Sequence, residues 1–162
     1  MEREAWFERT LQGDYDSGEA WEAVRALPHS GSAETFAQAM EWSYSNDGRK
    51  RARGVDVLCQ MYRRLDESQL PQRVYCDEAY RRIVQLMRTE QHPLVLRSAI
   101  RALGHLSDET AVPIILPYLD HSDRDIRFAV SFAMACLAKH PHAVASLLNL
   151  CNDEIARSEC GL

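Results

Sequence analysis

Five cysteines are the side chains of this sequence best suited to nucleophilic or redox chemistry: Cys59, Cys76, Cys136, Cys151 and Cys160. No two of them have the CxxC spacing of a metal or redox site, and an odd number cannot form a complete set of disulfides. Cys59, Cys136 and Cys151 also fall at apolar positions of helical patterns, where a thiol packs as a small apolar side chain. The sequence therefore predicts reduced cysteines that serve packing and not nucleophilic catalysis.

Two histidines, His140 and His142, flank Pro141 and could together contact a metal. A zinc site needs three or four ligands, and this pair supplies two. Pro141 is better suited to the first turn of a helix, where its missing N–H is not needed. The seven glycines are scattered singly, so the chain lacks a glycine-rich phosphate loop. We therefore expect no metal, no cofactor and no enzymatic activity.

Charge is distributed unevenly along the chain, whose net charge is −5. Residues 1–44 carry three arginines against nine acidic residues, and residues 102–162 carry four basic against eight acidic residues. Between them, residues 45–101 carry twelve basic against seven acidic residues, and we call this segment the basic belt. A protein that is acidic as a whole lacks the footprint of a general nucleic-acid binder. The belt favours either an acidic protein partner or a solvated charged face.

Apolar residues recur at helical spacing through most of the chain, and strand signals are nearly absent. Two such stripes are Val55, Leu58, Met61 and Leu65, and Ile126, Val130, Met134 and Leu137. Turn-forming residues separate segments of about ten to eighteen residues. The sequence therefore predicts an all-α fold, more than about 60% helical and without a sheet, in which short loops join antiparallel helices.

The length of 162 residues fits one domain, residues 1–162. The N-terminus lacks a basic start followed by an apolar core, and no apolar run approaches the roughly 20 residues that span a bilayer. These features predict a cytoplasmic protein without a membrane segment.

Two segments repeat at a constant offset of 31: residues 95–106 align with residues 126–137, and their apolar positions match. An earlier copy occupies residues 51–61. A repeat of this length built from two helices is typical of a stacked solenoid, because one helical hairpin cannot bury its apolar face without neighbours.

These copies resemble HEAT repeats, in particular the short bacterial form called PBS-lyase HEAT-like. The resemblance rests on Asp123, Ile126, Arg127, Val130 and Met134, on Leu103, Gly104 and Leu106, and on Thr110, Ala111, Val112 and Pro113. It implies a right-handed α-solenoid of stacked antiparallel helical hairpins. About four repeats are expected, approximately residues 17–45, 47–88, 93–119 and 123–151, with cap helices at residues 2–12 and 153–160.

Three positions depart from the family pattern. Leu96 stands where the family usually has arginine, and Lys50 where it has valine or isoleucine. Pro117 falls inside the second helix of its repeat, where proline removes a hydrogen bond and kinks the helix. We expect that helix to be short or bent.

Three tryptophans, Trp6, Trp21 and Trp42, lie in the first quarter of the chain and could form an aromatic recognition cage. Large amphipathic rings also suit a half-buried position at the end of a stack. We expect Trp21 and Trp42 to cover the N-terminal end of the solenoid.

The resemblance implies a binding surface, since the second helices of HEAT repeats line the inner face. On this basis Arg73, Tyr80, Arg81 and Arg88 would converge on an acidic partner. The alternative is a solvated face whose arginines pair with Asp77 and Glu78.

The resemblance also implies structural roles. In the family, an apolar residue precedes the repeat arginine, and Arg127 stands directly after such an apolar residue. An arginine at this position usually bonds an acidic residue of a neighbouring loop. Ala99 and Leu103 are expected in the core, since Ala99 lies between Leu96 and Leu103 on the inward stripe.

Taken together, these patterns favour a non-enzymatic scaffold or adaptor that binds a protein partner on the surface of its second helices. One alternative is an enzyme or enzyme accessory subunit resembling the bilin lyases, which would need a chromophore pocket. A second is a DNA-binding protein resembling the HEAT-like DNA glycosylases, which would need a basic groove with an essential acid and aromatic residues. Overall acidity disfavours nucleic acid as the partner.

Overall fold

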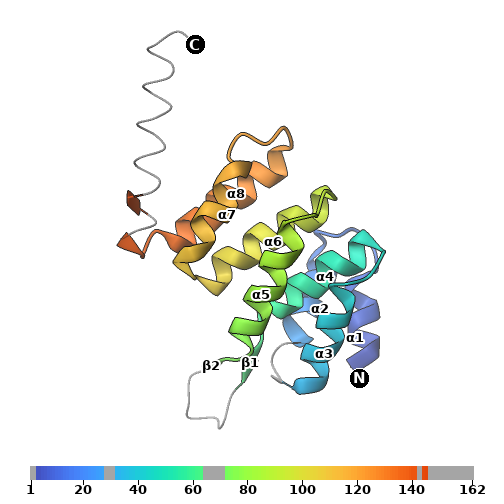
Figure 1. Ribbon diagram of the computed structural model, residues 1–162. Helices are drawn as coiled ribbons and strands as arrows, with labels where there is room; N and C mark the ends of the chain where they lie inside the picture. Colours follow the sequence, from blue (N-terminus) through green and yellow to red (C-terminus); the bar gives the residue numbers. More distant parts are fainter. Residues whose placement is uncertain (1–2, 28–31, 64–71, 142–143, 146–162) are drawn as a thin grey trace.

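The computed structural model describes residues 3–27, 32–63, 72–141 and 144–145 (Figure 1). Most of these residues are helical, which confirms the expected all-α fold. The helices are α1 (Arg3–Thr10), α2 (Gly18–Ala26), α3 (Ala33–Trp42), α4 (Gly48–Leu58), α5 (Cys76–Met87), α6 (Pro93–Leu106), α7 (Val112–Ile115) and α8 (Arg124–Leu137). Two short strands, β1 (Tyr62–Arg63) and β2 (Gln72–Arg73), lie between α4 and α5. The cap expected at residues 153–160 and most of the second half of repeat 123–151 fall outside the described residues.

Short polar side chains begin most of the longer helices. Ser17, Ser32, Asp47 and Asp123 accept hydrogen bonds from backbone N–H groups in the first turns of α2, α3, α4 and α8. These N-caps satisfy donors that have no partner within the helix. Helix α6 begins instead with Pro93, whose fixed φ angle suits the first turn.

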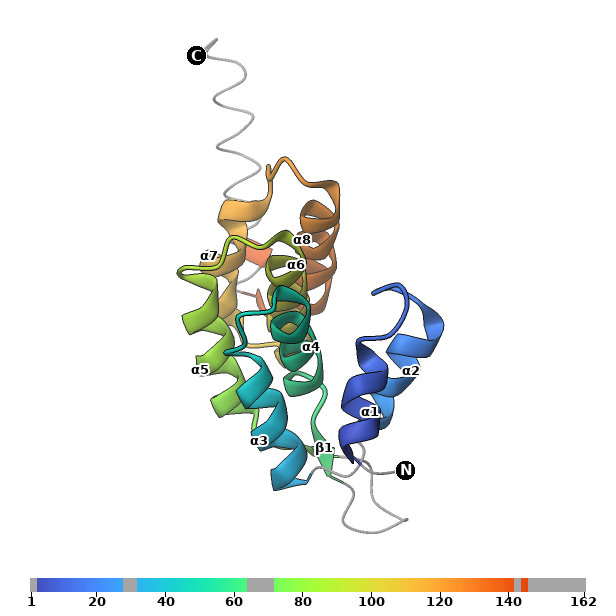
Figure 2. The ribbon, with the colours of Figure 1, turned by 90° about the vertical axis from the view of Figure 1, so that its right-hand side faces the viewer.

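Helices α4, α6 and α8 pack side by side in one layer (Figure 1). Helices α3, α5 and α7 form a second layer along one side of the first (Figure 2). Helices α6 and α8 begin and end at equivalent positions of the sequence repeat, since Pro93–Leu106 and Arg124–Leu137 are both offset by 31. The stacked helical repeat expected from the sequence is therefore present.

The first two helices depart from the expected arrangement. Helix α2 packs mainly against α1, and α3 packs mainly against α4, so α2 and α3 do not form the hairpin expected for residues 17–45. We call the α1–α2 pair, residues 3–27, the N-terminal hairpin. It lies across α4 from the layer that holds α3 and α5 (Figure 2).

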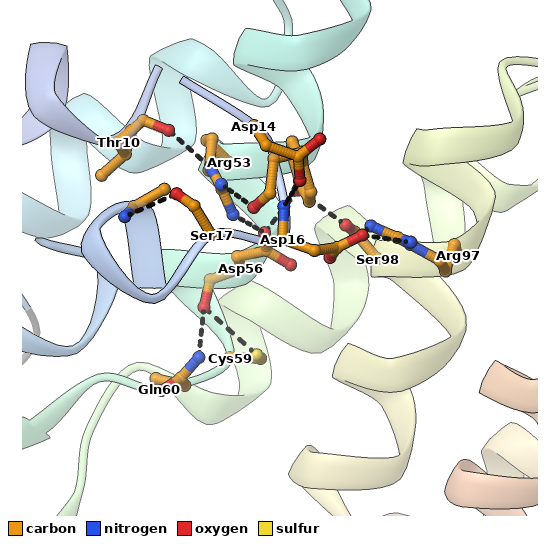
Figure 3. Close-up of polar contacts among 12 residues, drawn as sticks. Thr10, Asp14, Asp16, Ser17, Arg53, Asp56, Cys59, Gln60, Arg97 and Ser98 are labelled. Carbon is orange, nitrogen blue, oxygen red and sulfur yellow. Dashed lines mark hydrogen bonds and ion pairs between the residues drawn. The ribbon is translucent and has the colours of Figure 1, made fainter. Parts of the chain in front are cut away.

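Arg53 on α4 binds the N-terminal hairpin (Figure 3). Its side chain is fully buried. Its Nε donates to the carbonyl of Thr10 at 2.9 Å, and its Nη2 donates to the carbonyl of Tyr15 at 2.6 Å. Its Nη1 donates to Oδ2 of Asp56 at 3.1 Å, which pairs the charge. The carbonyl of Thr10 ends α1 and has no partner within that helix. One guanidinium thus joins α4 to both the end of α1 and the loop before α2.

Tyr15 completes this buried network. Its hydroxyl donates to Oδ2 of Asp56 at 2.5 Å and lies 3.0 Å from Oγ of Ser98 on α6. Burial, and next the neighbouring Asp56 carboxylate, raise the pKa of Tyr15 well above its usual value, so the hydroxyl keeps its proton. The guanidinium of Arg53 lies 3.6 Å from the centre of the Tyr15 ring, which adds a cation–π contact.

A second arginine also holds the hairpin (Figure 3). Arg97 on α6 donates two hydrogen bonds to the carboxylate of Asp16, both at 2.9 Å. This fork-to-carboxylate geometry is the strong form of an ion pair. The N-terminal hairpin is therefore bonded to two successive helices of the repeat layer.

Two glycines allow the helices to approach closely. A Cβ atom on Gly54 would lie 2.6 Å from the carbonyl oxygen of Ala39 on α3. A Cβ atom on Gly104 would lie 2.6 Å from Cα of Ala133 on α8. Neither site accepts a side chain unless the helices move apart. The close contact at Gly104 explains why the HEAT-like motif has glycine at this position.

A short antiparallel ladder between α4 and α5 was not expected. Tyr62 pairs with Arg73, and Arg63 pairs with Gln72. The prediction that Arg73 lies on the second helix of its repeat is therefore wrong, because this residue belongs to β2. Helix α5 begins only after Tyr75, which adopts a left-handed conformation with φ 60° and turns the chain from the strand into the helix.

Pro117 has the expected effect on the second helix of its repeat. Helix α7 is limited to Val112–Ile115, and a 3-10 turn, Leu116–Tyr118, contains the proline. The helix is short, as expected for a chain that lacks one N–H donor at this point.

The tryptophans pack near the N-terminal hairpin. Trp42 is buried, and its ring meets the edge of the Phe7 ring with centroids 4.8 Å apart. Trp21 is half-buried, and its ring lies 5.2 Å from the guanidinium carbon of Arg53. Both rings thus help to bury this end of the protein.

Replacement of Ala99 by aspartate should destabilise the fold severely. Ala99 is fully buried in the core that also contains Leu96 and Leu103. An unpaired carboxylate at this position should lower the free energy of unfolding by about 3 kcal/mol or more. Denaturant unfolding measures the change, with Ala135→Asp at an exposed position of α8 as the control. Equal unfolding midpoints for the two variants would contradict the packing of α6.

Replacement of Gly54 by alanine should also destabilise the protein, although alanine favours helices. The new methyl group would meet the backbone of α3, and forced separation of packed helices costs about 1–3 kcal/mol. Gly18→Ala is the matched control, because nothing lies within 4 Å of a Cβ there. That control should be neutral or slightly stabilising. A Gly54→Ala melting temperature at or above that of Gly18→Ala would disprove the close approach of α3 and α4.

Candidate binding groove

Most arginines of the basic belt bond within the protein. Arg51 donates to both carboxylate oxygens of Glu90, at 2.8 and 3.1 Å. The buried Arg82 donates to the hydroxyl of Ser43 at 2.8 Å and to its carbonyl at 2.5 Å. Its guanidinium also lies over the ring of Tyr44. With Arg53 and Arg97 holding the N-terminal hairpin, these side chains are structural.

Two belt arginines stay exposed, Arg81 on α5 and Arg88 directly after its last residue. Arg81 donates only to the carbonyl of Asp77, one turn earlier in the same helix, at 3.2 Å. In the described residues, the side chain of Arg88 makes no hydrogen bond or ion pair. The alternative, in which these arginines pair with the carboxylates of Asp77 and Glu78, is not seen, because no ion pair joins these described residues.

A groove of about 670 Å³ opens between α5, the turn after α6 and His140. It is lined by Cys76, Asp77, Tyr80, Arg81, Leu106, Ser107, Asp108, Glu109 and His140. The groove is open to solvent and combines side chains from two successive repeats. Such a depression between stacked repeats can receive an extended segment of another protein.

Tyr80 and Thr110 form the bond that bridges the two walls of the groove. The hydroxyl of Tyr80 lies 2.6 Å from Oγ1 of Thr110, and Oγ1 of Thr110 donates to Oδ1 of Asp108 at 2.6 Å. Burial raises the pKa of Tyr80, so its hydroxyl remains a donor at neutral pH. This chain fixes the position of the aromatic ring.

The two walls differ in charge. Helix α5 contributes Arg81 beside Asp77, whereas the turn after α6 contributes Asp108 and Glu109. His140 also lines the groove. Its Nε2 lies 2.8 Å from the carbonyl oxygen of Ser107, the usual distance for an N–H donor. Among the side chains that line the groove, the one arginine lies on the α5 side.

The structure brings together two of the four residues expected at the binding site. Tyr80 and Arg81 both line the groove. Arg88 lies beyond them at the C-terminal end of α5, about two turns from Arg81 along the same face. Arg73 lies on β2 and donates to the carbonyl of His105, so it stands outside the groove.

Arg127 is bonded differently from the expected ion pair. Its Nη1 donates to the backbone carbonyls of His121 at 2.7 Å and Ser122 at 2.9 Å. The neighbouring Asp123 is used as the N-cap of α8. Arg127 therefore ties down the turn before α8 through backbone groups and not through a carboxylate.

Two of the described cysteines, Cys59 and Cys76, are protected from solvent to different degrees. Burial raises the pKa of Cys59 far above its usual range, and its Sγ donates to the carbonyl of Asp56 at 3.4 Å. Cys76 is half-buried at the groove, and burial raises its pKa as well. Within the described ranges, no three histidine, cysteine or acidic side chains gather where they could bind a metal.

Sequence reasoning missed the residues that hold the N-terminal hairpin. Arg97 and Asp16 are 81 residues apart, so no local pattern connects them. A signal existed for Arg53 and Asp56, which are a charged i,i+3 pair inside the otherwise apolar stretch of α4. Charges in such a position are paired when they are buried.

No helix in the described part of the chain is both long and apolar enough to cross a bilayer.

The known structures most relevant here share the fold at low sequence identity. Human deoxyhypusine hydroxylase in complex with glycerol is 16% identical with a TM-score of 0.53, and the match covers 86% of this chain and 44% of that one. The complex of CpcE and CpcF of phycocyanin lyase from Nostoc sp. PCC7120 is 18% identical with a TM-score of 0.53, and the match covers 91% of this chain and 56% of that one. This chain thus spans about half the length of these relatives, and at such identities the likeness shows the fold alone.

Sequence comparison identifies the family. No protein of curated function matches the chain. The sequence model described as HEAT repeats matches residues 80–160, which is half of the chain and contains α6, α7 and α8. The stacked layers and the close contact at Gly104 agree with this match. The chain belongs to the HEAT repeat family.

Proposed function

We propose that this protein is a non-catalytic scaffold or adaptor that binds a partner protein in the groove beside α5. The observation that carries the proposal is the open groove of about 670 Å³ in which Tyr80 and Arg81 meet the turn after α6. Its walls come from two repeats, so the stacking of the repeats creates it. An open groove of this kind suits a polypeptide segment better than an enclosed small molecule.

The exposed charges of α5 indicate the chemistry of the partner. Arg81 and Arg88 stand two helical turns apart on one face and have no carboxylate partner among the described residues. An acidic stretch of a partner would pair with both. Asp108 and Glu109 on the opposite wall would repel it, so we place the acidic contact along α5 only.

The internal use of the basic belt weakens the DNA-binding alternative. Arg51, Arg53, Arg82 and Arg97 are bonded to groups of the protein itself and are not free to contact phosphates. Phosphate contacts dominate affinity for nucleic acids. The bilin-lyase-like alternative rests on family resemblance, and a visible absorbance titration with free bilin tests it directly.

Arg81→Glu should weaken binding of the partner at least tenfold and leave folding intact. Like charges that face each other across an interface cost more than about 1.4 kcal/mol, which corresponds to that factor. Exposed charge reversals change the free energy of unfolding by less than about 0.5 kcal/mol. Partners captured from the native host with the wild-type protein are identified by mass spectrometry, purified and titrated calorimetrically.

The control is Arg3→Glu, which makes the same charge change on α1, on the far side of the protein from α5 (Figure 2). The wild-type affinity should also fall when salt is raised to roughly 0.5 M, because screening shortens the reach of these charges. The binding site would be refuted if Arg81→Glu left the affinity unchanged, or if Arg3→Glu lowered it by the same factor.

A further inference from the structure

A second surface lies on the other side of the α4, α6, α8 layer from the groove. Along α6, Arg97, Arg101 and His105 form a half-buried stripe at intervals of one turn. The repeat offset of 31 sets Phe128 and Phe132 of α8 level with Arg97 and Arg101. We call these five residues the α6–α8 face.

Arg101 is the unusual residue of this face. Its guanidinium carbon lies 5.3 Å from the centre of the Trp21 ring and 5.4 Å from that of the Phe132 ring. It thus stands between an aromatic side chain of the N-terminal hairpin and one of α8. Among the described residues, no carboxylate, hydroxyl or carbonyl bonds to this guanidinium. Arg101 therefore presents an uncompensated positive charge between two aromatic rings.

The surroundings of Arg101 add positive and aromatic character. The ring of His105 meets the Phe132 ring edge-on, with centroids 5.1 Å apart. Phe128, one turn before Phe132, is 70% exposed. Burial, and after it the charges of Arg101 and Arg73, lower the pKa of His105, which agrees with a positive local potential. Aromatic residues and arginine are the side chains most enriched at the energetic centres of protein interfaces.

The N-terminal hairpin shows how this stripe binds an acidic segment. One turn before Arg101, Arg97 holds the carboxylate of Asp16 with two hydrogen bonds of 2.9 Å. The preceding residue, Tyr15, places its ring 5.3 Å from the same guanidinium. An aromatic residue followed by an acidic one thus occupies Arg97, whereas Arg101 has no carboxylate partner among the described residues.

We propose that an acidic segment of a partner protein docks on the α6–α8 face beside the N-terminal hairpin. A carboxylate of the partner pairs with Arg101, and an adjacent aromatic or aliphatic side chain packs on Phe128 and Phe132. The charge of Arg101 selects the acid, and the exposed rings select the apolar neighbour. This surface goes beyond the proposed function, because it lies in the other helix layer and shares no residue with the groove.

Selection from a phage library of random linear peptides tests the docking site with the whole chain as bait. Selected peptides should carry aspartate or glutamate next to an aromatic or large aliphatic residue. For a synthetic copy of the strongest binder, fluorescence polarisation should show at least a tenfold loss of affinity with Arg101→Glu. Phe128→Ala should weaken binding about fivefold or more, and its exposure makes it harmless to folding.

The control variant is Arg3→Glu, which makes the same charge reversal on α1, where Arg3 donates to Gln38 of α3, and should leave the affinity within about twofold. The proposal is overturned if no acidic peptide is selected, or if Arg101→Glu and Phe128→Ala leave the affinity of the selected peptide unchanged. Peptides that respond instead to Arg81→Glu and Arg88→Glu would overturn it and support the groove. A single-stranded oligonucleotide that binds in place of the peptides, with the same loss in Arg101→Glu and Phe128→Ala, would identify nucleic acid as the occupant and also overturn it.

Discussion

The buried guanidinium of Arg53 is the interaction on which the N-terminal half of this structure depends. A charge removed from water is tolerated only when it is paired and its donors are satisfied. Asp56 supplies the pairing, and the carbonyls of Thr10 and Tyr15 take two further N–H groups. Those two carbonyls belong to the N-terminal hairpin. The position of the hairpin is therefore set by the hydrogen bonds that the buried guanidinium on α4 must make.

The same constraint explains how the arginines of the chain are divided. Arg82 and Arg97 bond to Ser43 and Asp16, and their charge is used within the fold. Arg81 and Arg101 have no acidic partner among the described residues, and they lie in different helix layers. Most arginines of the basic belt thus bond within the protein, and only a few of its charges stay free. Those free charges, and not the count of basic residues, indicate where a partner can bind.

Periodicity and capping residues predicted the helices well, because both are local. The offset of 31 placed α6 and α8 with the same bounds, and Pro117 shortened α7 as expected. The packing of α2 was not predicted, because it depends on contacts of Arg53 and Arg97 with residues far away in the sequence. Of the candidate site, Tyr80 and Arg81 line one groove, whereas Arg73 belongs to a ladder whose two-residue strands leave almost no periodic signal.

Amide hydrogen exchange of Arg53→Lys tests most directly whether this guanidinium holds the hairpin. Lysine keeps the charge beside Asp56 but lacks the planar fork that reaches two carbonyls at once. Loss of a charged hydrogen bond is worth about 1.5–3 kcal/mol, so exchange in α1 and α2 should accelerate at least tenfold, while α6 and α8 keep their protection. Arg81→Lys on the exposed face of α5 is the control. Unchanged exchange in the hairpin, or an equal acceleration in α6 and α8, would contradict the role assigned to Arg53.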